Sequence, residues 1–413
     1  MAKAVSRIVD VRDGVIGPGE PRKSVVVPRR LSDFPGASLA HLEVAKKLSN
    51  PLLMGPPICD EFVAFVEHLF TEDEAAVACH LGMTKKSAAT VARSAGLPQD
   101  KVEEILRSLG TDKHCINKSG GAGQEKYSLM PVFPGIFEMV LIGKDPEALN
   151  DWDRKFAEMF EDLYMTGYWL VDDTKMGPGM VRYLPVAESV AANPMALPTD
   201  KLEPVLEPFS IFGVGHCQCR TSAQVEGKGC GKPTLNCLVM GEIAQGGIRD
   251  GWLQKVTRAE ALEIKREAES HGMVNWMMNV AAYKSQSSCS CCGCCCHNFR
   301  MISEFGAPGM IAPPHFLPAF DAAACNYCGK CALACPMAAL VIDTKEKKRE
   351  HLGARCIGCG LCVLACDKAK ATTIKPVDEY KGPPKSVGRL FALSMPGQVR
   401  ATFKTWRGRR GAS

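Results

Sequence analysis

The sequence predicts an α+β protein made of several small domains. Its 413 residues are too many for one small core, and ordinary domain sizes suggest two to four domains. Apolar residues recur at helical spacing through residues 61–170, whereas short apolar strands and turns follow after residue 209. Cysteine is distributed just as unevenly, because only three of the 21 cysteines precede residue 217.

Charge and apolar content limit the class of protein. The formal net charge is only +5 and hydrophobic residues make up 46%, so the chain as a whole is not expected to bind nucleic acid. No apolar run is long enough to span a bilayer, and residues 1–4 lead into a charged arm without the apolar segment of a signal peptide. Clustered cysteines without a secretion signal favour metal ligation in a reducing cytoplasm over disulfides. We therefore expect a cytoplasmic, metal-binding protein.

Residues 1–60 are expected to form an extended, proline-rich arm. Only residues 37–48 have helical spacing, and prolines interrupt the remainder. These prolines are Pro18, Pro21, Pro28, Pro35, Pro51, Pro56 and Pro57. Such an arm is expected to wrap another domain or a subunit.

Residues 61–170 are predicted to form a helical domain that contains a helix–turn–helix. Two helices are expected at 88–95 and 100–109 around a turn at 96–98, and a hairpin with a glycine-rich tip at 120–123 follows. This order resembles a winged-helix domain. The aromatic stripe within residues 135–168 is expected to be packed core.

The predicted second helix of this motif is slightly acidic. It carries Asp100, Glu103 and Glu104 against Lys101 and Arg107, a net charge of −1. A helix that reads DNA normally presents cations to the phosphates. We therefore favour a winged helix that docks onto protein over one that binds DNA.

The middle of the chain is predicted to contain a linker at 171–208 and a cysteine-rich α/β domain at 209–317. A strand is expected at 209–212, and a helix from Thr257 to about Ser270 is capped by Glu260 and ended by Gly272. Ten candidate metal ligands flank this helix: Cys217, Cys219, Cys230 and Cys237 before it, and Cys289, Cys291, Cys292, Cys294, Cys295 and Cys296 after it.

The most specific motif lies between Cys325 and Cys366. Two runs have the form Cys-x-x-Cys-x-x-Cys-x-x-x-Cys: Cys325, Cys328, Cys331 and Cys335, then Cys356, Cys359, Cys362 and Cys366. Over residues 318–378 this pattern resembles a bacterial-type ferredoxin with two [4Fe–4S] clusters. Zinc ribbons, the alternative, use two ligands per turn instead of three followed by a crossover. Asp367 departs from the family, which usually has a proline after the last cysteine.

The resemblance implies a crossed ligand set. Cys325, Cys328, Cys331 and Cys366 are expected to hold one cluster, and Cys356, Cys359, Cys362 and Cys335 the other. The reason we expect for the crossover is that the fourth cysteine of each run begins a helix pointing the other way. Iron–sulfur centres also favour an anaerobe or a sheltered site.

One or two further [4Fe–4S] clusters are expected in the middle region. The set Cys217, Cys219, Cys230 and Cys237 is assigned to one, and up to four of the later six cysteines to another, with exchange between the sets possible. Structural zinc and free or disulfide-bonded thiols are the alternatives. The Cys-Cys-Gly element is similar to motifs of heterodisulfide-reductase subunits, although the spacing differs.

Four polar residues beside these thiols are candidate cofactor contacts. His216 and His297 are expected to donate hydrogen bonds to cluster sulfur, with direct ligation as the alternative. Arg220 and Arg300 are expected to offset cluster charge or to be ordinary surface arginines.

Residues 379–413 form a basic tail. From Tyr380 onward there are eight Lys or Arg and no acidic residue, with apolar residues among them. The tail is expected either to dock onto an acidic partner or an anionic membrane surface, or to be a solvated tail.

These features together favour electron transfer. A cluster held by four thiolates has no open site for a substrate, and the sequence contains no dinucleotide-binding glycine motif, P-loop, nucleophile elbow or radical-SAM triad. We expect a non-catalytic subunit that relays low-potential electrons to a partner oxidoreductase in a larger complex. The alternatives are a redox-sensing winged-helix regulator that binds DNA, and a thiol- or disulfide-active subunit with a non-cubane cluster.

Overall fold

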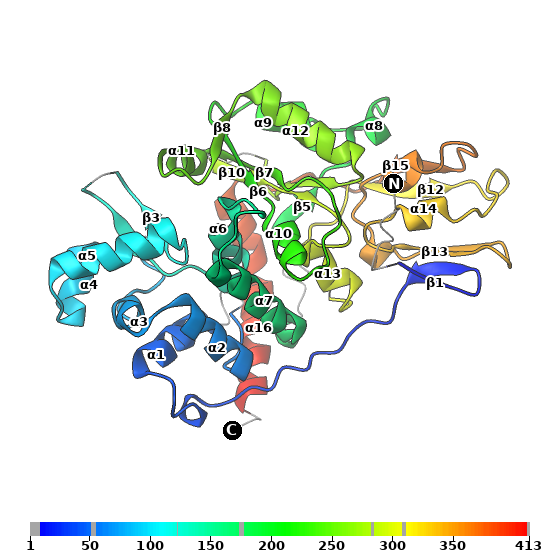
Figure 1. The fold of residues 1–413 in the computed structure, drawn as a ribbon. Coiled ribbons are helices and arrows are strands. Elements are labelled where there is room, and N and C mark those ends of the chain that lie inside the picture. The colour runs from blue at the N-terminus through cyan, green and yellow to red at the C-terminus, as the bar shows by residue number, and fades with distance from the viewer. Residues whose placement is uncertain are drawn as a thin grey trace. The chain divides into compact units, whose positions relative to one another are not determined.

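The computed structural model of the protein describes residues 9–50, 55–121, 123–172, 177–281, 285–307 and 311–410. The chain divides into two compact units (Figure 1). Unit 1 comprises Met1–Arg22 with Asp173–Gln398, and unit 2 comprises Lys23–Asp172 with Val399–Ser413. Helices and several small sheets make the protein α+β, as predicted. Parts of the expected arm, linker and tail (1–8, 51–54, 173–176 and 411–413) lie outside the described residues.

Unit 2 is mainly helical and has an aromatic core. Its α-helices are α1 (Leu39–Leu48), α2 (Asp60–Leu69), α3 (Glu72–Ala78), α4 (Ala88–Ala95), α5 (Gln99–Arg107), α6 (Phe137–Ile142) and α7 (Asp151–Met165). Phe65, Phe137, Phe156 and Phe160 are fully buried, and the Phe137 and Phe160 rings stack with centroids 3.9 Å apart. The aromatic stripe is therefore packed core, as predicted.

The helix–turn–helix and the hairpin expected from the sequence are both present in unit 2. Helices α4 and α5 follow one another, with Gly96 ending α4 in the left-handed conformation that glycine tolerates. Strands β3 (Asn117–Ser119) and β4 (Lys126–Ser128) pair antiparallel. The charged residues Asp100, Glu103 and Glu104 of α5 are exposed.

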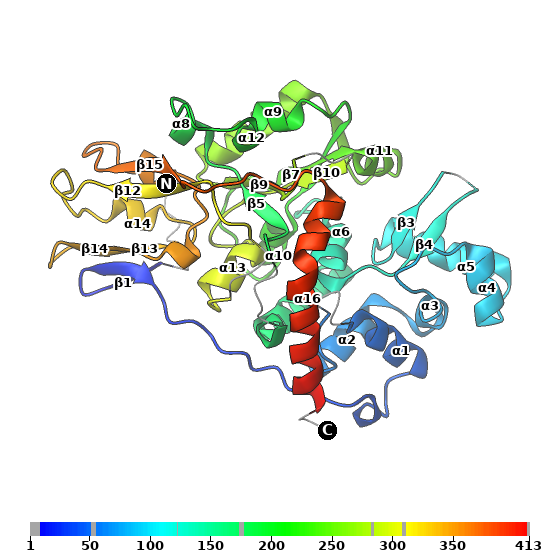
Figure 2. The ribbon, with the colours of Figure 1, turned by 180° about the vertical axis from the view of Figure 1, so that it is seen from behind.

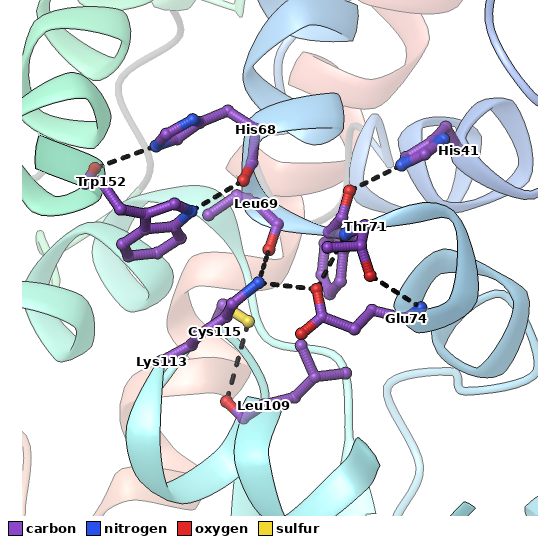
Figure 3. Close-up of polar contacts among 10 residues, drawn as sticks. His41, His68, Leu69, Thr71, Glu74, Leu109, Lys113, Cys115 and Trp152 are labelled. Atoms are coloured by element: carbon purple, nitrogen blue, oxygen red, sulfur yellow. Dashed lines mark hydrogen bonds and ion pairs between the residues drawn. The ribbon is translucent and has the colours of Figure 1, made fainter.

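Polar groups at the helix ends of unit 2 are satisfied within the unit (Figure 3). Lys113 donates to the carbonyl of Leu69 at 3.3 Å and pairs with Glu74 at 2.6 Å. Thr71 and Glu74 form a capping box at the start of α3. The thiol of Cys115 donates to a backbone carbonyl, that of Leu109, at 3.7 Å. These contacts stabilise the fold and require no ligand.

The middle of unit 1 consists of two antiparallel sheets with helices packed on them. The strands are β5 (Val181–Tyr183), β6 (Phe212–His216), β7 (Leu235–Gly241), β8 (Gln254–Val256), β9 (Val274–Met278), β10 (Ser285–Ser288) and β11 (Ser290–Cys291). One sheet has the order β10-β7-β6-β8 and the other β11-β9-β5. Every pairing between these strands is antiparallel, so the α/β arrangement expected for this region was wrong. The strand expected at 209–212 instead begins at Phe212.

Helices α10 (Gln218–Val225), α11 (Glu242–Arg249), α12 (Arg258–Ser270) and α13 (His297–Ser303) accompany these sheets. Helix α12 has the predicted boundaries. Thr257 and Glu260 form the expected capping box at its start, and Gly272, with a φ of 68°, follows its end.

Residues 177–208 are more ordered than the linker we expected. They contain β5, α8 (Ala187–Val190) and α9 (Leu202–Leu206). Strand β5 pairs with β9, and Tyr183 and Leu206 are buried. The short apolar pieces of this segment bury their side chains in unit 1, which a free linker does not do.

The ferredoxin-like part of unit 1 contains two small antiparallel pairs and two short helices. Strand β12 (Phe316–Phe320) pairs with β15 (Thr372–Pro376), and β13 (Leu340–Asp343) pairs with β14 (Lys348–His351). The helices are α14 (Lys330–Leu333) and α15 (Leu361–Leu364). The N-terminal hairpin, β1 (Val9–Arg12) and β2 (Val15–Pro18), adds to this sheet, because Ile16 pairs with Ile342.

Residues Val387–Arg410 of the basic tail form one long helix, α16, coloured red in Figure 2. Most of its described side chains are exposed, so this part of the tail is helical and solvated, and its docking onto a partner stays a prediction. Among the described residues, no helix combines the length and apolarity needed to cross a membrane.

Candidate metal centres

Two cavities in the ferredoxin-like part are lined by four cysteines each. The larger cavity is lined by Cys335, Cys356, Cys359 and Cys362, and the empty space within and in front of its lining is about 410 Å³. The smaller cavity is lined by Cys325, Cys328, Cys331 and Cys366, with about 290 Å³. These are the two crossed sets that the resemblance implied. The donor chemistry therefore fits two [4Fe–4S] clusters.

The structural reason for the crossover differs from the one we expected. Neither Cys335 nor Cys366 begins a helix. Instead α14 ends at Leu333 and α15 at Leu364, and the fourth cysteine follows each helix after one further residue. The third thiol of each run thus lies within the short helix and the fourth lies beyond its end, and the two line different cavities.

Burial disfavours the thiolate form of the cysteines that line the larger cavity. Burial raises the pKa of Cys356 to about 11 and also raises the pKa of Cys335. Deprotonating such thiols requires a nearby positive charge, which a metal centre supplies.

Arg349 is a contact of the smaller cavity that the sequence did not indicate. Its guanidinium donates to the Cys331 sulfur at 3.9 Å. Asp367 forms an exposed ion pair with Lys330 at 3.4 Å and leaves the set of thiols unchanged.

Four of the ten middle cysteines form a compact group, which we call the tetrathiol site. Its members are Cys230, Cys292, Cys294 and Cys295, whose sulfurs all lie within 4.8 Å of one another. Cys230 comes from the loop between α10 and β7, whereas the other three precede α13. Cys230 of the expected set Cys217, Cys219, Cys230 and Cys237 thus lies with three cysteines of the later run. This is the exchange between sets that the sequence left open.

The other six thiols, Cys217, Cys219, Cys237, Cys289, Cys291 and Cys296, form a second set that we call the six-thiol group. Side-chain interactions connect Cys217 with Cys219, Cys219 with Cys296, and Cys296 with Cys291. A further interaction connects Cys237 with Cys289. Cys217, Cys237, Cys291 and Cys296 are buried, and Cys219 and Cys289 are half-buried. This group can supply the four thiolates of one further cluster, with two to spare.

Two buried cations lie among these thiols. Arg220 donates to the carbonyl of Ser290 at 2.8 Å, to Asn236, and to the Cys292 sulfur at 3.9 Å. Lys265 on α12 is fully buried and donates to Ser290 and to two backbone carbonyls. Neither cation has a carboxylate partner among the described residues. Burial is the largest effect on Lys265 and lowers its pKa to about 8. The nearby thiols of Cys289, Cys237 and Cys291 act in the opposite direction and offset only part of this decrease.

The expectations for the remaining polar residues have different outcomes. Arg220 is buried against the thiols, as expected for a residue that offsets negative charge. Arg300 is buried too, but it pairs with Glu304 at 2.9 Å one turn later on α13. His216 contacts the Thr234 hydroxyl through Nδ1 at 2.9 Å. The backbone of His297 contacts the Cys219 thiol. Direct ligation by either imidazole stays a prediction.

Thiols from both regions meet in one packed core. Cys291 and Cys296 of the six-thiol group belong to the same buried cluster as Cys359 of the larger cavity. Cys335 and Cys356 pack against it. Two further contacts join the regions: Val186 donates to the carbonyl of Cys359 at 2.9 Å, and Arg355 donates to the carbonyls of Met337 and Ser303.

Residues 317–367 match the family model described as the 4Fe-4S dicluster domain. This match identifies an iron–sulfur segment of ferredoxin type within the chain. No curated protein and no solved structure gives a significant match.

Proposed function

We propose that this chain is an iron–sulfur electron-transfer subunit that relays low-potential electrons to or from a partner oxidoreductase. The shared core of unit 1 is the observation that carries the proposal, because thiols of the six-thiol group and of the larger ferredoxin cavity pack within it. When bound, a [4Fe–4S] cluster held by four thiolates exchanges one electron at a time and offers no position to a substrate. The relay would use the two ferredoxin sites and one or two more in the middle region.

The protein's own residues would hold these sites close together and keep water out. Cys335 and Cys359 line the larger cavity from different turns, and the backbone contact from Val186 fixes the segment around Cys359. Arg349 and Arg220 donate to thiol sulfurs, and such donors raise the potential of a redox centre by stabilising negative charge on it. We place the protein in the cytoplasm, with the basic residues of 379–413 as a docking element for an acidic partner.

Anaerobic purification followed by iron and acid-labile sulfide analysis tests the proposal. About eight irons per chain would fill the two ferredoxin sites, and any excess would lie in the middle region. The dithionite-reduced protein is expected to give the EPR signals of reduced [4Fe–4S] centres and to pass electrons to a one-electron acceptor without any organic substrate. Colourless protein with zinc in the ferredoxin sites would contradict the proposal.

A redox-sensing, DNA-binding regulator is the second candidate, because the helix–turn–helix and hairpin are both present in unit 2. The exposed acidic residues of α5 argue against it. A salt-dependent gel-shift assay with genomic fragments separates the two, and sequence-selective binding would reverse the ranking.

A thiol- or disulfide-active subunit is the third candidate. It is favoured by the number of middle cysteines, because the two sets together exceed the eight thiolates that two cubanes use. Anaerobic alkylation of the intact holoprotein tests this candidate. Rapid modification of one or two middle thiols, with turnover of a disulfide substrate, would support it over simple electron transfer.

A further inference from the structure

The tetrathiol site differs in geometry from the two ferredoxin sites. We propose that Cys230, Cys292, Cys294 and Cys295 bind a single tetrahedral divalent metal ion, zinc or iron, and not a [4Fe–4S] cubane. The Cys230 and Cys292 sulfurs are 4.0 Å apart, and those of Cys294 and Cys295 are 3.7 Å apart. Four thiolates at about 2.3 Å from one zinc ion have sulfurs about 3.8 Å apart in a regular tetrahedron. The four thiols therefore surround the volume of one ion.

A cubane requires a different arrangement of sulfurs. Its four thiolates bind four different irons, so the whole inorganic core must fit between them. The ferredoxin thiols are spread more widely than those of the tetrathiol site, because in neither set do the sulfurs all lie within 4.8 Å of one another. Within the described ranges, the tetrathiol site is the only group of three or more Cys, His, Asp or Glu side chains whose ligand atoms lie within 4.8 Å of one another. The same chain thus contains both types of thiol site.

The surroundings of the tetrathiol site suit a closed structural ion. Ala223 of α10, Ala268 of α12 and Met273 pack around the buried Cys292 and Cys295, and Cys230 and Cys294 are half-buried beside them. A divalent ion with four thiolates carries about two negative charges, and Arg220 offsets part of this charge at the Cys292 sulfur. Four protein ligands leave no open position, as in structural zinc sites. The ion would fasten the loop after α10 to the segment before α13.

This assignment changes the expected metal content. The six-thiol group alone remains for a third cubane, with Lys265 beside it. The chain would then hold about twelve irons in three cubanes and about one mononuclear ion, instead of about sixteen irons in four cubanes. The inference does not depend on the electron-transfer proposal, because it concerns only which metal the four thiols bind.

The experiment uses the full chain, purified without oxygen from cells supplied with both zinc and iron. Elemental analysis is expected to find about one zinc ion per chain, and X-ray absorption at the zinc edge should show four sulfurs at about 2.3 Å and no metal–metal scattering. If iron fills the site, the oxidised protein should instead show the EPR signal of a single high-spin ferric tetrathiolate. Either result supports the mononuclear site. Finding neither ion in the intact chain would overturn it.

A double variant, Cys294→Ser with Cys295→Ser, tests the ligands. It should lose about one metal ion while the EPR signals of the reduced ferredoxin sites stay unchanged. Cys79→Ser is the matched control, because its thiol donates to the backbone carbonyl of Ala76 in unit 2. Loss of about four irons from the double variant would show a cubane and refute the proposal. If the double variant does not fold, the X-ray absorption of the intact chain decides alone.

Discussion

Gly358 lies between two thiols of the larger ferredoxin cavity and has a φ of 66°, a backbone conformation that favours glycine. A Cβ atom there would lie 2.4 Å from the carbonyl oxygen of Phe316 and 2.5 Å from Pro314. We expect Gly358→Ala to destabilise this loop by about 1–3 kcal/mol, because both the backbone strain and the clash with Phe316 oppose it. The measurement is the rate at which the cluster absorbance disappears in urea without oxygen.

Gly353 provides the matched control for this substitution. It lies three residues before Cys356, its φ is not positive, and a Cβ there would meet nothing within 4 Å. Gly353→Ala should therefore lose its clusters at the rate of the unsubstituted protein. Equal loss rates in the two variants would show that close packing at Gly358 is unimportant.

His68 in unit 2 gives a pH dependence with a definite sign. Its ring stacks on Trp152 and donates from Nε2 to the Trp152 carbonyl at 3.0 Å (Figure 3). Burial lowers the pKa of His68, and the charges of Lys113 and Lys155 lower it further. Unfolded His68 therefore binds its proton more readily than folded His68, so stability is lost as pH falls below about 6.5.

Thermal unfolding of unit 2 between pH 5 and pH 8 measures this effect. The unsubstituted protein should unfold at lower temperature as pH falls, and His68→Gln should reduce that slope because glutamine does not titrate. Burial also lowers the pKa of His80, so some pH dependence will persist in the variant. If the unfolding temperature depends on pH equally in both proteins, His68 does not contribute to the pH dependence of stability.

Single residues also show what the sequence can and cannot reveal. The ferredoxin cysteines were predictable because their ligand role depends on spacing along a short local segment. Lys265 was not, because its burial depends on the carbonyls of Asn236 and Ser288, which belong to two distant strands. A lysine between Ala261 and Ala268 on the buried face of α12 was the available signal, and it was overlooked.

At the scale of elements, the N-terminal hairpin has a specific role beside the smaller cavity. Ile16 of β2 is buried in the cluster that contains Cys331 and Ile342. Val15 also pairs with β13 but is 38% exposed. We expect Ile16→Ala to destabilise this part by about 2–4 kcal/mol, because it leaves a cavity against the cysteine segment. Val15→Ala should change stability by less than about 0.5 kcal/mol.

Anaerobic urea titration, followed by the visible absorbance of the bound clusters, measures the difference between these two variants. If both variants shift the midpoint equally, the hairpin acts only through backbone pairing and not through Ile16. On exposure to air, the visible absorbance of the clusters should decay faster in Ile16→Ala than in Val15→Ala. The reason is that oxygen reaches the segment around Cys331 more easily when Ile16 no longer covers it.

Elements fixed by neighbouring residues were predictable, and those fixed by distant partners were not. The start of α12 follows from Thr257 and Glu260, which are three residues apart. By contrast, β2 is four residues long and pairs with β13 more than 300 residues later. Strand β5 is shorter still and pairs with β9. The hairpin itself had a local signal that was overlooked, since Asp13-Gly14 forms its turn between alternating valines. The pairing of β2 with β13 and of β5 with β9 had no such signal, so these segments were expected to be an arm and a linker.

At the scale of the whole molecule, the proposed relay depends on the thiols near the shared core of unit 1. Cys335 packs against that core and lines the larger cavity, whereas Cys331, one turn earlier, lines the smaller cavity. Cys335→Ala should therefore lose about four irons from the larger site and leave the smaller site filled. Electrons that enter at the smaller site should then reach the middle region much more slowly, because the intervening centre is missing.

Freeze-quench EPR after mixing with a low-potential donor measures this transfer. The unsubstituted protein should show successive reduction of its centres, and Cys335→Ala should reduce the smaller site at the normal rate while the middle centre lags. Cys79→Ser in unit 2 controls for the loss of a cysteine as such. Undiminished reduction of the middle centre in Cys335→Ala would mean that electrons bypass the larger site, and the thiols in the shared core would then be a packing feature without a role in conduction.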